Sequence, residues 1–249
     1  MQRRVFAANW KMNHGPTDAR EFLRSFLRHY ARQSDRQVIF FPASVTLAAM
    51  VDGLKDRLDI RLGVQNIHWE DKGAFTGEIS AAMARDAGAH YVLVGHSERR
   101  HVFGETDEET QRKVAACFRA RMAPILCVGE TLEQREAGET EAVVLRQLRA
   151  GLAGSDASQI ALAYIAYEPV WAIGTGKNAT PDDASRVHRV IRAELRTLSP
   201  DKYLAIPILY GGSVNRGNAA PLLAAQEVDG VLVGGASLDA EAWSAIVRA

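Results

Sequence analysis

Short apolar segments rich in Val, Ile and Ala recur along this chain of 249 residues, and each is followed by a segment with helical spacing. The apolar segments begin near Val5, Val38, Ile60, Tyr91, Ala123, Ile160, Ala205 and Gly230. Continuous apolar strands are typical of a parallel sheet that is buried on both faces. Eight strand–helix units in about 250 residues match a closed (β/α)8 barrel, although an open doubly wound sheet shows the same local pattern.

Polar residues and glycines follow the carboxyl ends of the predicted strands, whereas the opposite ends show nothing comparable. These segments are Asn9-Trp10-Lys11, Gln65-Asn66, Gly95-His96-Ser97-Glu98, Cys127-Val128-Gly129-Glu130, Glu168, Tyr210-Gly211-Gly212-Ser213 and Gly234-Gly235. Active sites of (β/α)8 barrels are built from the loops at this end of the strands, so the asymmetry favours the barrel. No linker, low-complexity segment or charge run divides the chain, and we predict one domain over residues 1–249.

Composition excludes several partners. Thirty basic residues balance thirty acidic ones, so no overall field favours nucleic acid or a membrane surface. Cys117 and Cys127 both lie in apolar segments, which predicts no disulfide framework and a reducing compartment. No apolar run reaches membrane-spanning length. The segment before the first predicted strand is too short for the apolar region of a signal peptide, so we expect a cytoplasmic protein. No His, Cys or carboxylate motif predicts a metal site.

Glu168 follows the apolar run 160–167 and precedes Pro169. Because proline cannot donate to a sheet ladder and restrains the preceding residue, we expect the strand to end at Glu168. Thr180-Pro181 then predicts a helix start, and residues 169–177 between them form a predicted lid. Any glutamate can be a solvated edge residue. A carboxylate in this setting can instead have a raised pKa and act as a general base.

Two further polar positions stand at strand ends. His96 precedes Ser97-Glu98, and a short helix starting there would favour a neutral imidazole that donates a hydrogen bond. The alternative is a purely structural histidine. Lys11 and Asn9 flank Trp10 after the first strand. Lys11 is either solvated or points into the mouth of the barrel, where it would bind a phosphate or polarise a carbonyl.

Gly174, Ser213, Gly234 and Gly235 are either simple turn residues or a phosphate cradle of backbone N–H groups, as is usual after the last strands of barrels. Residues 174–179 also satisfy G-x-G-x-x-A. That dinucleotide fingerprint should follow its strand directly, whereas here five residues intervene, so we interpret the segment as a lid hinge. Cys127 is interpreted as a packing residue, since no partner would activate it as a nucleophile. The long loop 73–80, with an aromatic residue, suits an interface.

Six stretches, in order and spacing, give the chain a resemblance to the triosephosphate isomerase family over nearly its whole length. They are Asn9-Trp10-Lys11-Met12-Asn13, residues 73–80, residues 94–100, residues 166–176, residues 209–214 and residues 232–237. The departures are Ala8, where many members have glycine, and Pro207, which falls within the predicted seventh strand and would mark a bulge there.

The resemblance implies interconversion of dihydroxyacetone phosphate and D-glyceraldehyde 3-phosphate through an enediolate, as part of glycolysis and gluconeogenesis. Glu168 would be the base, His96 the neutral electrophile, and Lys11 the cation near the phosphate, with Asn9 beside it. Gly174, Ser213, Gly234 and Gly235 would bind the phosphate. No metal or organic cofactor is implied.

Members of the family are homodimers, so the resemblance also implies self-association through loop 73–80, with Thr76 at the interface. Two alternatives remain open from the sequence. An aldolase-type lyase on a phosphate-binding barrel would need a Schiff-base lysine at a strand end, for which Lys11 is a weak candidate. A non-catalytic relative should have lost Glu168, His96 or Lys11, and all three are present.

Overall fold

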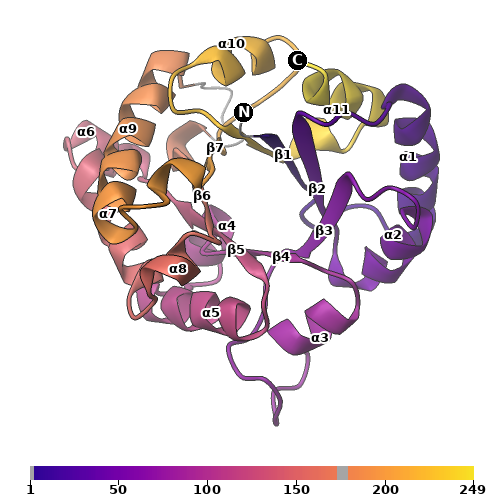
Figure 1. Cartoon of the computed structure of the whole chain (residues 1–249), viewed down its shortest axis with the longest axis horizontal. Coiled ribbons are helices and arrows are strands. Elements are labelled where there is room, and N and C mark those ends of the chain that lie inside the picture. The colour runs from indigo at the N-terminus through magenta and orange to yellow at the C-terminus, as the bar shows by residue number, and fades with distance from the viewer. Residues whose placement is uncertain (1–2, 173–178) are drawn as a thin grey trace.

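The computed structural model describes residues 3–172 and 179–249 and contains a closed barrel of eight parallel strands. Each strand pairs with the next one along the chain, and β1 closes the barrel by pairing in parallel with β8. Figure 1 shows the barrel end-on, with the helices in a ring around it. The closed order excludes the open doubly wound sheet and confirms the predicted (β/α)8 barrel.

The strands are short and the helices connect them on the outside. The strands are β1 (Arg4–Asn9), β2 (Arg36–Phe41), β3 (Ile60–Val64), β4 (Tyr91–Val94), β5 (Ala123–Val128), β6 (Tyr164–Tyr167), β7 (Ile208–Tyr210) and β8 (Gly230–Val233). The helices are α1 (Pro16–His29), α2 (Leu47–Gly53), α3 (Ala81–Asp86), α4 (Ser97–His101), α5 (Asp107–Arg119), α6 (Leu132–Glu136), α7 (Thr140–Leu152), α8 (Ala157–Ile160), α9 (Pro181–Leu198), α10 (Ala219–Ala224) and α11 (Ala240–Val247). Short 3₁₀ segments are η1 (Ser44–Thr46), η2 (Val170–Ala172), η3 (Tyr203–Ala205) and η4 (Gly235–Ser237).

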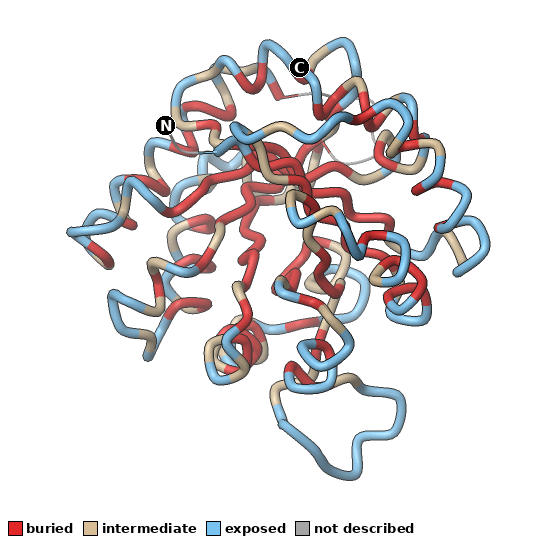
Figure 2. The backbone as a smooth tube through the Cα atoms, turned by 45° about the vertical axis from the view of Figure 1, so that its right-hand side comes forward, coloured by how far each residue is buried: buried red, intermediate tan, exposed pale blue. Residues whose placement is uncertain are grey.

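Two apolar layers hold the barrel together, because successive residues of a strand point to opposite faces. Val5 and Ala7 of β1 point into the barrel, where they meet Cys127 and other interior side chains. Phe6 and Ala8 point outward and pack beneath the helices. Figure 2 shows that most strand residues are buried, whereas exposed residues lie on the outer helices and on one protruding loop. Cys127 is fully buried, as expected of a packing residue.

The sequence also predicts helix starts at Thr106-Asp107-Glu108-Glu109 and Thr131-Leu132-Glu133-Gln134, which fit the capping box, and a helix begins at each of them and at Thr180-Pro181. Thr106, Thr131 and Thr180 each cap a helix with the side-chain oxygen, and all three form capping boxes. Pro181 occupies the first turn of α9, where its missing N–H costs no hydrogen bond.

Two predicted strand starts were wrong. Ile160 ends helix α8, and β6 begins only at Tyr164, because Asp156 caps a short helical turn that uses the first apolar residues of the run. Ala205 lies in η3, and β7 begins at Ile208. Pro207 therefore precedes the strand, where its carbonyl accepts the Ile165 N–H, and it marks no bulge within β7.

Candidate active site

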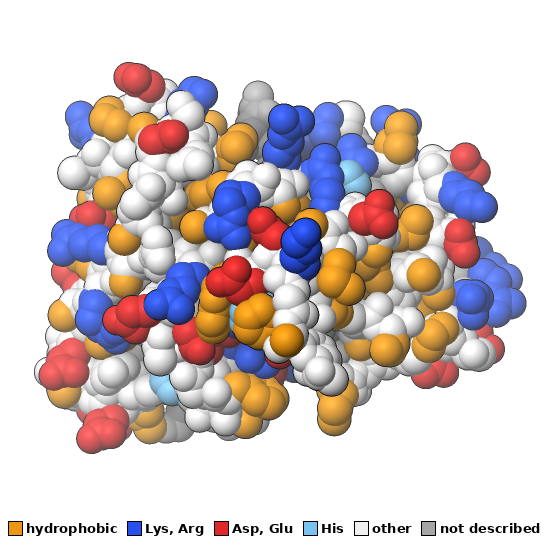
Figure 3. Space-filling view, turned by 90° about the horizontal axis from the view of Figure 1, so that it is seen from below, with side chains coloured by type: hydrophobic (Ala, Val, Ile, Leu, Met, Phe, Trp, Pro, Cys, Tyr) orange, Lys and Arg blue, Asp and Glu red, His pale blue; other side chains and the backbone are white. Residues whose placement is uncertain are grey.

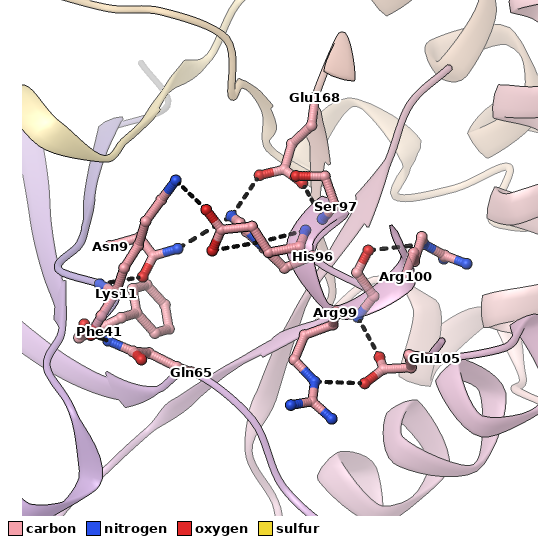
Figure 4. A network of polar contacts seen from close by, with 12 residues as sticks. Asn9, Lys11, Phe41, Gln65, His96, Ser97, Arg99, Arg100, Glu105 and Glu168 are labelled. Atoms are coloured by element: carbon pink, nitrogen blue, oxygen red, sulfur yellow. Dashed lines mark hydrogen bonds and ion pairs between the residues drawn. The ribbon is translucent and has the colours of Figure 1, made fainter. Parts of the chain in front are cut away.

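The predicted base and the predicted imidazole meet at the carboxyl end of the barrel. Glu168 directly follows β6 and His96 lies two residues after β4. The Nε2 atom of His96 lies 3.0 Å from Oε1 of Glu168, and the backbone N–H of Ser97 donates to Oε2 at 2.8 Å. Both side chains are buried, and Figure 4 shows them pointing toward each other. Both carboxylate oxygens therefore have a partner.

A short helix, α4, does start at Ser97, and His96 is its N-cap residue. Its Nδ1 accepts the backbone N–H of Glu98 at 3.2 Å. Because a neutral imidazole has one acceptor and one donor nitrogen, this contact assigns the ring proton to Nε2, the atom that faces Glu168. The backbone turns into this position at Gly95, whose φ of 70° is readily adopted by glycine.

The charges of the pair act on each other. Burial raises the pKa of Glu168, but the nearby His96 and the Ser97 N–H outweigh it, and the net shift is below the ordinary value. The predicted raised pKa of this carboxyl is therefore wrong for the site without substrate. Burial lowers the pKa of His96, whereas Glu168 raises it, with a net upward shift. The contact at Nδ1 favours the neutral His96 ring that we expect, whereas the Glu168 carboxylate favours the protonated ring.

Lys11 stands at the entrance of the same site. Its Nζ lies 2.5 Å from Oε1 of Glu98, and both side chains are partly exposed. Its backbone has a φ of 53°, a left-handed conformation that costs a non-glycine residue of order 1 kcal/mol. Contacts on both sides hold it there: its N–H donates to Asn9 Oδ1 at 3.0 Å, and its carbonyl accepts from Gln65 at 2.8 Å. The amide nitrogen of Asn9 lies 3.2 Å from Nε2 of His96.

A cavity of about 540 Å³ connects these groups with glycine-rich turns. Asn9, Lys11, His96 and Glu168 line it together with Gly211, Ser213, Gly234 and Gly235. A methyl group added at Gly235 would meet no atom within 4 Å, so this backbone is open to the cavity. The structure thus brings together all the predicted catalytic and phosphate-binding residues that it describes. Gly174, like the rest of the predicted hinge up to residue 177, lies outside the described residues, as does Ile173 of the predicted lid.

One carboxylate at this end was not assigned from the sequence. Glu130 follows β5, is fully buried, and accepts hydrogen bonds from the Tyr167 hydroxyl at 3.1 Å and from Trp171 Nε1 at 2.9 Å. Arg135 lies 3.8 Å from the same carboxylate. Glu130 therefore anchors η2, the described part of the predicted lid. A glutamate directly after an apolar strand was the available signal.

Other predicted features can be placed as well. Loop residues 70–78 are exposed and project away from the barrel (Figure 2), and Thr76 is among them. Within residues 3–172 and 179–249, no group of three or more His, Cys, Asp or Glu side chains is arranged to hold a metal ion. No helix of the same residues is long and apolar enough to cross a bilayer.

The family model described as triosephosphate isomerase matches residues 4–249. The chain belongs to the triosephosphate isomerase family. The triosephosphate isomerase of Roseiflexus sp. (strain RS-1) is 49% identical over 249 residues, which cover 100% of this chain and 98% of that protein. That of Endomicrobium trichonymphae is 47% identical over 248 residues, with 100% and 99% covered.

A solved structure agrees with these sequences. The crystal structure of triosephosphate isomerase from Bartonella henselae superimposes with a TM-score of 0.88 at 38% identity and covers 98% of this chain and 97% of that chain. The predicted family and the predicted activity, interconversion of dihydroxyacetone phosphate and D-glyceraldehyde 3-phosphate, are thereby confirmed. Nothing in these similarities favours the aldolase-type lyase.

Proposed function

We propose that Glu168, His96, Lys11 and Asn9 carry the isomerase reaction in the 540 Å³ cavity, within a single barrel domain formed by residues 1–249. The observation that supports this most is the 3.0 Å approach of a buried carboxylate to a buried imidazole nitrogen at one wall of that cavity. An isomerase of this type moves a proton between two adjacent carbons, and such a step needs one base and one hydrogen-bond donor to the oxygens.

The proposed reaction begins when Glu168 removes a proton from the carbon next to the substrate carbonyl. The electrons of that C–H bond form the carbon–carbon double bond of an enediolate, and the carbonyl oxygen becomes negatively charged. The Nε2–H of His96 and the ammonium of Lys11 stabilise that oxygen. The hydroxyl proton on the oxygen of the first carbon then passes to the former carbonyl oxygen, and the first carbon becomes the new carbonyl. Glu168 returns its proton to the neighbouring carbon, so that the overall reaction is a rearrangement without any external oxidant or reductant.

Substrate binding changes the partners of both charged groups. Nε2 of His96 carries one proton, so a substrate oxygen that accepts it takes the place of Oε1 of Glu168. A carboxylate that loses this partner in a dry site has a higher pKa, which makes it a stronger base. An anionic substrate likewise competes with Glu98 for Lys11, whose ion pair is only partly buried.

The phosphate is proposed to bind at the glycine-rich side of the cavity, through Lys11, Ser213 and the backbone at Gly234 and Gly235, together with Gly174. Support comes from the open backbone at Gly235 and from the position of Lys11, whose Cε would lie 3.2 Å from a methyl group at Gly234. Backbone N–H groups that point into a cavity bind phosphate well because they donate hydrogen bonds directly to its oxygens.

Turnover of both triose phosphates by the purified protein tests this function. We expect reduction of dihydroxyacetone phosphate in a coupled assay when D-glyceraldehyde 3-phosphate is supplied, and unchanged activity after dialysis against a chelator, since no cofactor is expected. Borohydride trapping with substrate should label no lysine. A folded sample without turnover, or a trapped lysine adduct, would count against the proposal.

The chain is also proposed to form a homodimer through loop 73–80, with Thr76 at the interface. Among the described residues, most of the exposed large apolar side chains lie on the segments that follow the four adjacent strands β1–β4: Met12, Val45, Phe75, Met83, Val102 and Phe103. Exposed apolar surface of this kind marks a protein–protein contact. Light scattering at micromolar concentration should give twice the chain mass, and a monomer would refute the proposal. The cytoplasmic location stays a prediction.

A further inference from the structure

A second cavity lies at the opposite end of the barrel from the active site. It has a volume of about 410 Å³ and is formed around the beginnings of β4, β5, β6 and β7. Its wall combines basic and aromatic side chains, including Arg85, His90, Tyr91, Phe118, Arg121 and Tyr164. Both the volume and the mixture of apolar side chains with a few polar groups are typical of small-molecule sites.

The charge of this cavity is positive. No Asp or Glu lines it, and no carboxylate of residues 3–172 and 179–249 forms an ion pair with Arg85, His90 or Arg121. Burial and the neighbouring charges of Arg61 and Arg85 lower the pKa of His90. Figure 3, which views the α3 side of the barrel, shows Lys and Arg side chains gathered with a histidine at its upper edge. Unpaired basic groups beside a cavity favour an anionic ligand.

Arg121 is held in an unfavourable backbone conformation. It follows α5 with a φ of 57°, a position at which helices usually end with glycine. In the left-handed conformation the Cβ of a residue other than glycine crowds the neighbouring backbone. The carbonyl of Arg121 accepts a hydrogen bond from the Arg85 guanidinium, so the two basic residues are held together. A strained residue that keeps a charged side chain at a cavity points to a role for that side chain.

The aromatic part of the wall is rigid. The rings of Tyr91 and Tyr164 lie edge to face, with centroids 5.4 Å apart, at the beginnings of β4 and β6. The side chain of Gln37, from β2 inside the barrel, donates to the Tyr91 hydroxyl and accepts from the Tyr164 hydroxyl at 3.3 Å. Fixed rings offer a planar ligand apolar contact at little entropic cost.

We propose that this cavity binds a small organic anion that carries a planar ring, of the chemical class of a nucleoside monophosphate. The anionic group would contact Arg85, Arg121 and His90, and the ring would lie against Tyr91 and Tyr164. The site is separate from the isomerase cavity, so the two ligands bind without competition. The proposal is therefore independent of the residue roles assigned to the active site.

Isothermal titration of the full chain with adenosine 5′-monophosphate tests the proposal. One molecule should bind per chain, with the same affinity in the presence and absence of saturating triose phosphate. Adenosine carries only the ring and inorganic phosphate only the anionic group. Each should bind at least about tenfold more weakly than adenosine 5′-monophosphate. Absence of binding at millimolar concentration, displacement by triose phosphate, or equal binding of phosphate alone would overturn the proposal.

Arg121→Gly provides the sharpest variant, because glycine relieves the backbone strain while it removes the guanidinium. We expect a melting temperature equal to or above that of the unchanged protein, normal isomerase activity, and adenosine 5′-monophosphate binding weakened about tenfold or more. Arg20→Ala, which removes the same charge from the exposed face of α1, should bind as the unchanged protein does. Equal affinity of the Arg121→Gly protein, or an equal loss in both variants, would contradict the proposal.

Discussion

The Nε2 atom of His96 and the Oε1 atom of Glu168 lie 3.0 Å apart, although one residue follows β4 and the other follows β6. The contact exists because β4, β5 and β6 are adjacent parallel strands whose carboxyl ends meet at one rim of the barrel. It joins the one carboxylate and the one imidazole that the proposed reaction requires, and the first prediction concerns the carboxylate.

Glu168→Ala should leave the fold intact and lower kcat by about three orders of magnitude or more, because no other carboxylate of residues 3–172 and 179–249 lines the cavity. Removing a buried charge is favourable, and this offsets part of the free energy lost with its hydrogen bonds. The melting temperature should therefore change by only a few degrees. Steady-state kinetics together with circular dichroism check both points. Near-normal activity in a folded sample would place the base elsewhere.

Lys11→Met should raise KM for both triose phosphates by roughly 10- to 100-fold, since it removes one charge-assisted contact while keeping most of the side-chain length. Lys55→Met is the matched control, because Lys55 is a solvated lysine of the outer surface. Its kinetics should equal those of the unchanged protein. Similar KM values for the two variants would show that Lys11 does not contact substrate.

Gly129→Ala should reduce both stability and kcat. A methyl group there would lie 1.7 Å from the carbonyl oxygen of Glu168, so the backbone that carries the base must shift. Small displacements of a catalytic group are costly, and we expect a loss of about 100-fold in kcat. Gly15→Ala serves as the control, since its methyl group would come no closer than 3.9 Å to another atom. Thermal unfolding and steady-state rates measure both effects, and unchanged values for Gly129→Ala would contradict the packing described above.

Stability should fall between pH 6.5 and pH 4 because of His188. Burial lowers the pKa of this histidine from 6.5 to about 4, and its Nδ1 lies 2.8 Å from the Glu227 carbonyl. The unfolded chain binds a proton below pH 6.5 whereas the folded chain does not, so acid favours unfolding over this range. The full effect is about 3 kcal/mol.

Urea unfolding at pH 7.0 and pH 4.5, with the unchanged protein and with His188→Asn, measures this contribution. The variant has no titrating group at this position and should lose less stability on acidification, although it starts from a lower value. An equal loss in the two proteins would mean that His188 does not carry the effect.

Local sequence patterns predict many of the strands and helix starts. Eight apolar runs predicted the strands, and the Thr106, Thr131 and Thr180 caps predicted helix starts, because both signals depend only on neighbouring residues. The same local view failed at Ile160 and Ala205, where apolar residues are used by a helical turn before the strand begins.

The sequence by itself determined which residue types stand at the strand ends, and with the family match it determined the reaction. Only the tertiary structure decided how these groups act on one another. It placed the His96 imidazole and the Ser97 N–H on the Glu168 carboxylate, which lowers a pKa that burial alone would raise. It also placed the Glu130 carboxylate where it accepts a hydrogen bond from Trp171 Nε1. The physical reason is that electrostatic interactions depend on distances across the closed barrel, which spacing along the chain does not contain.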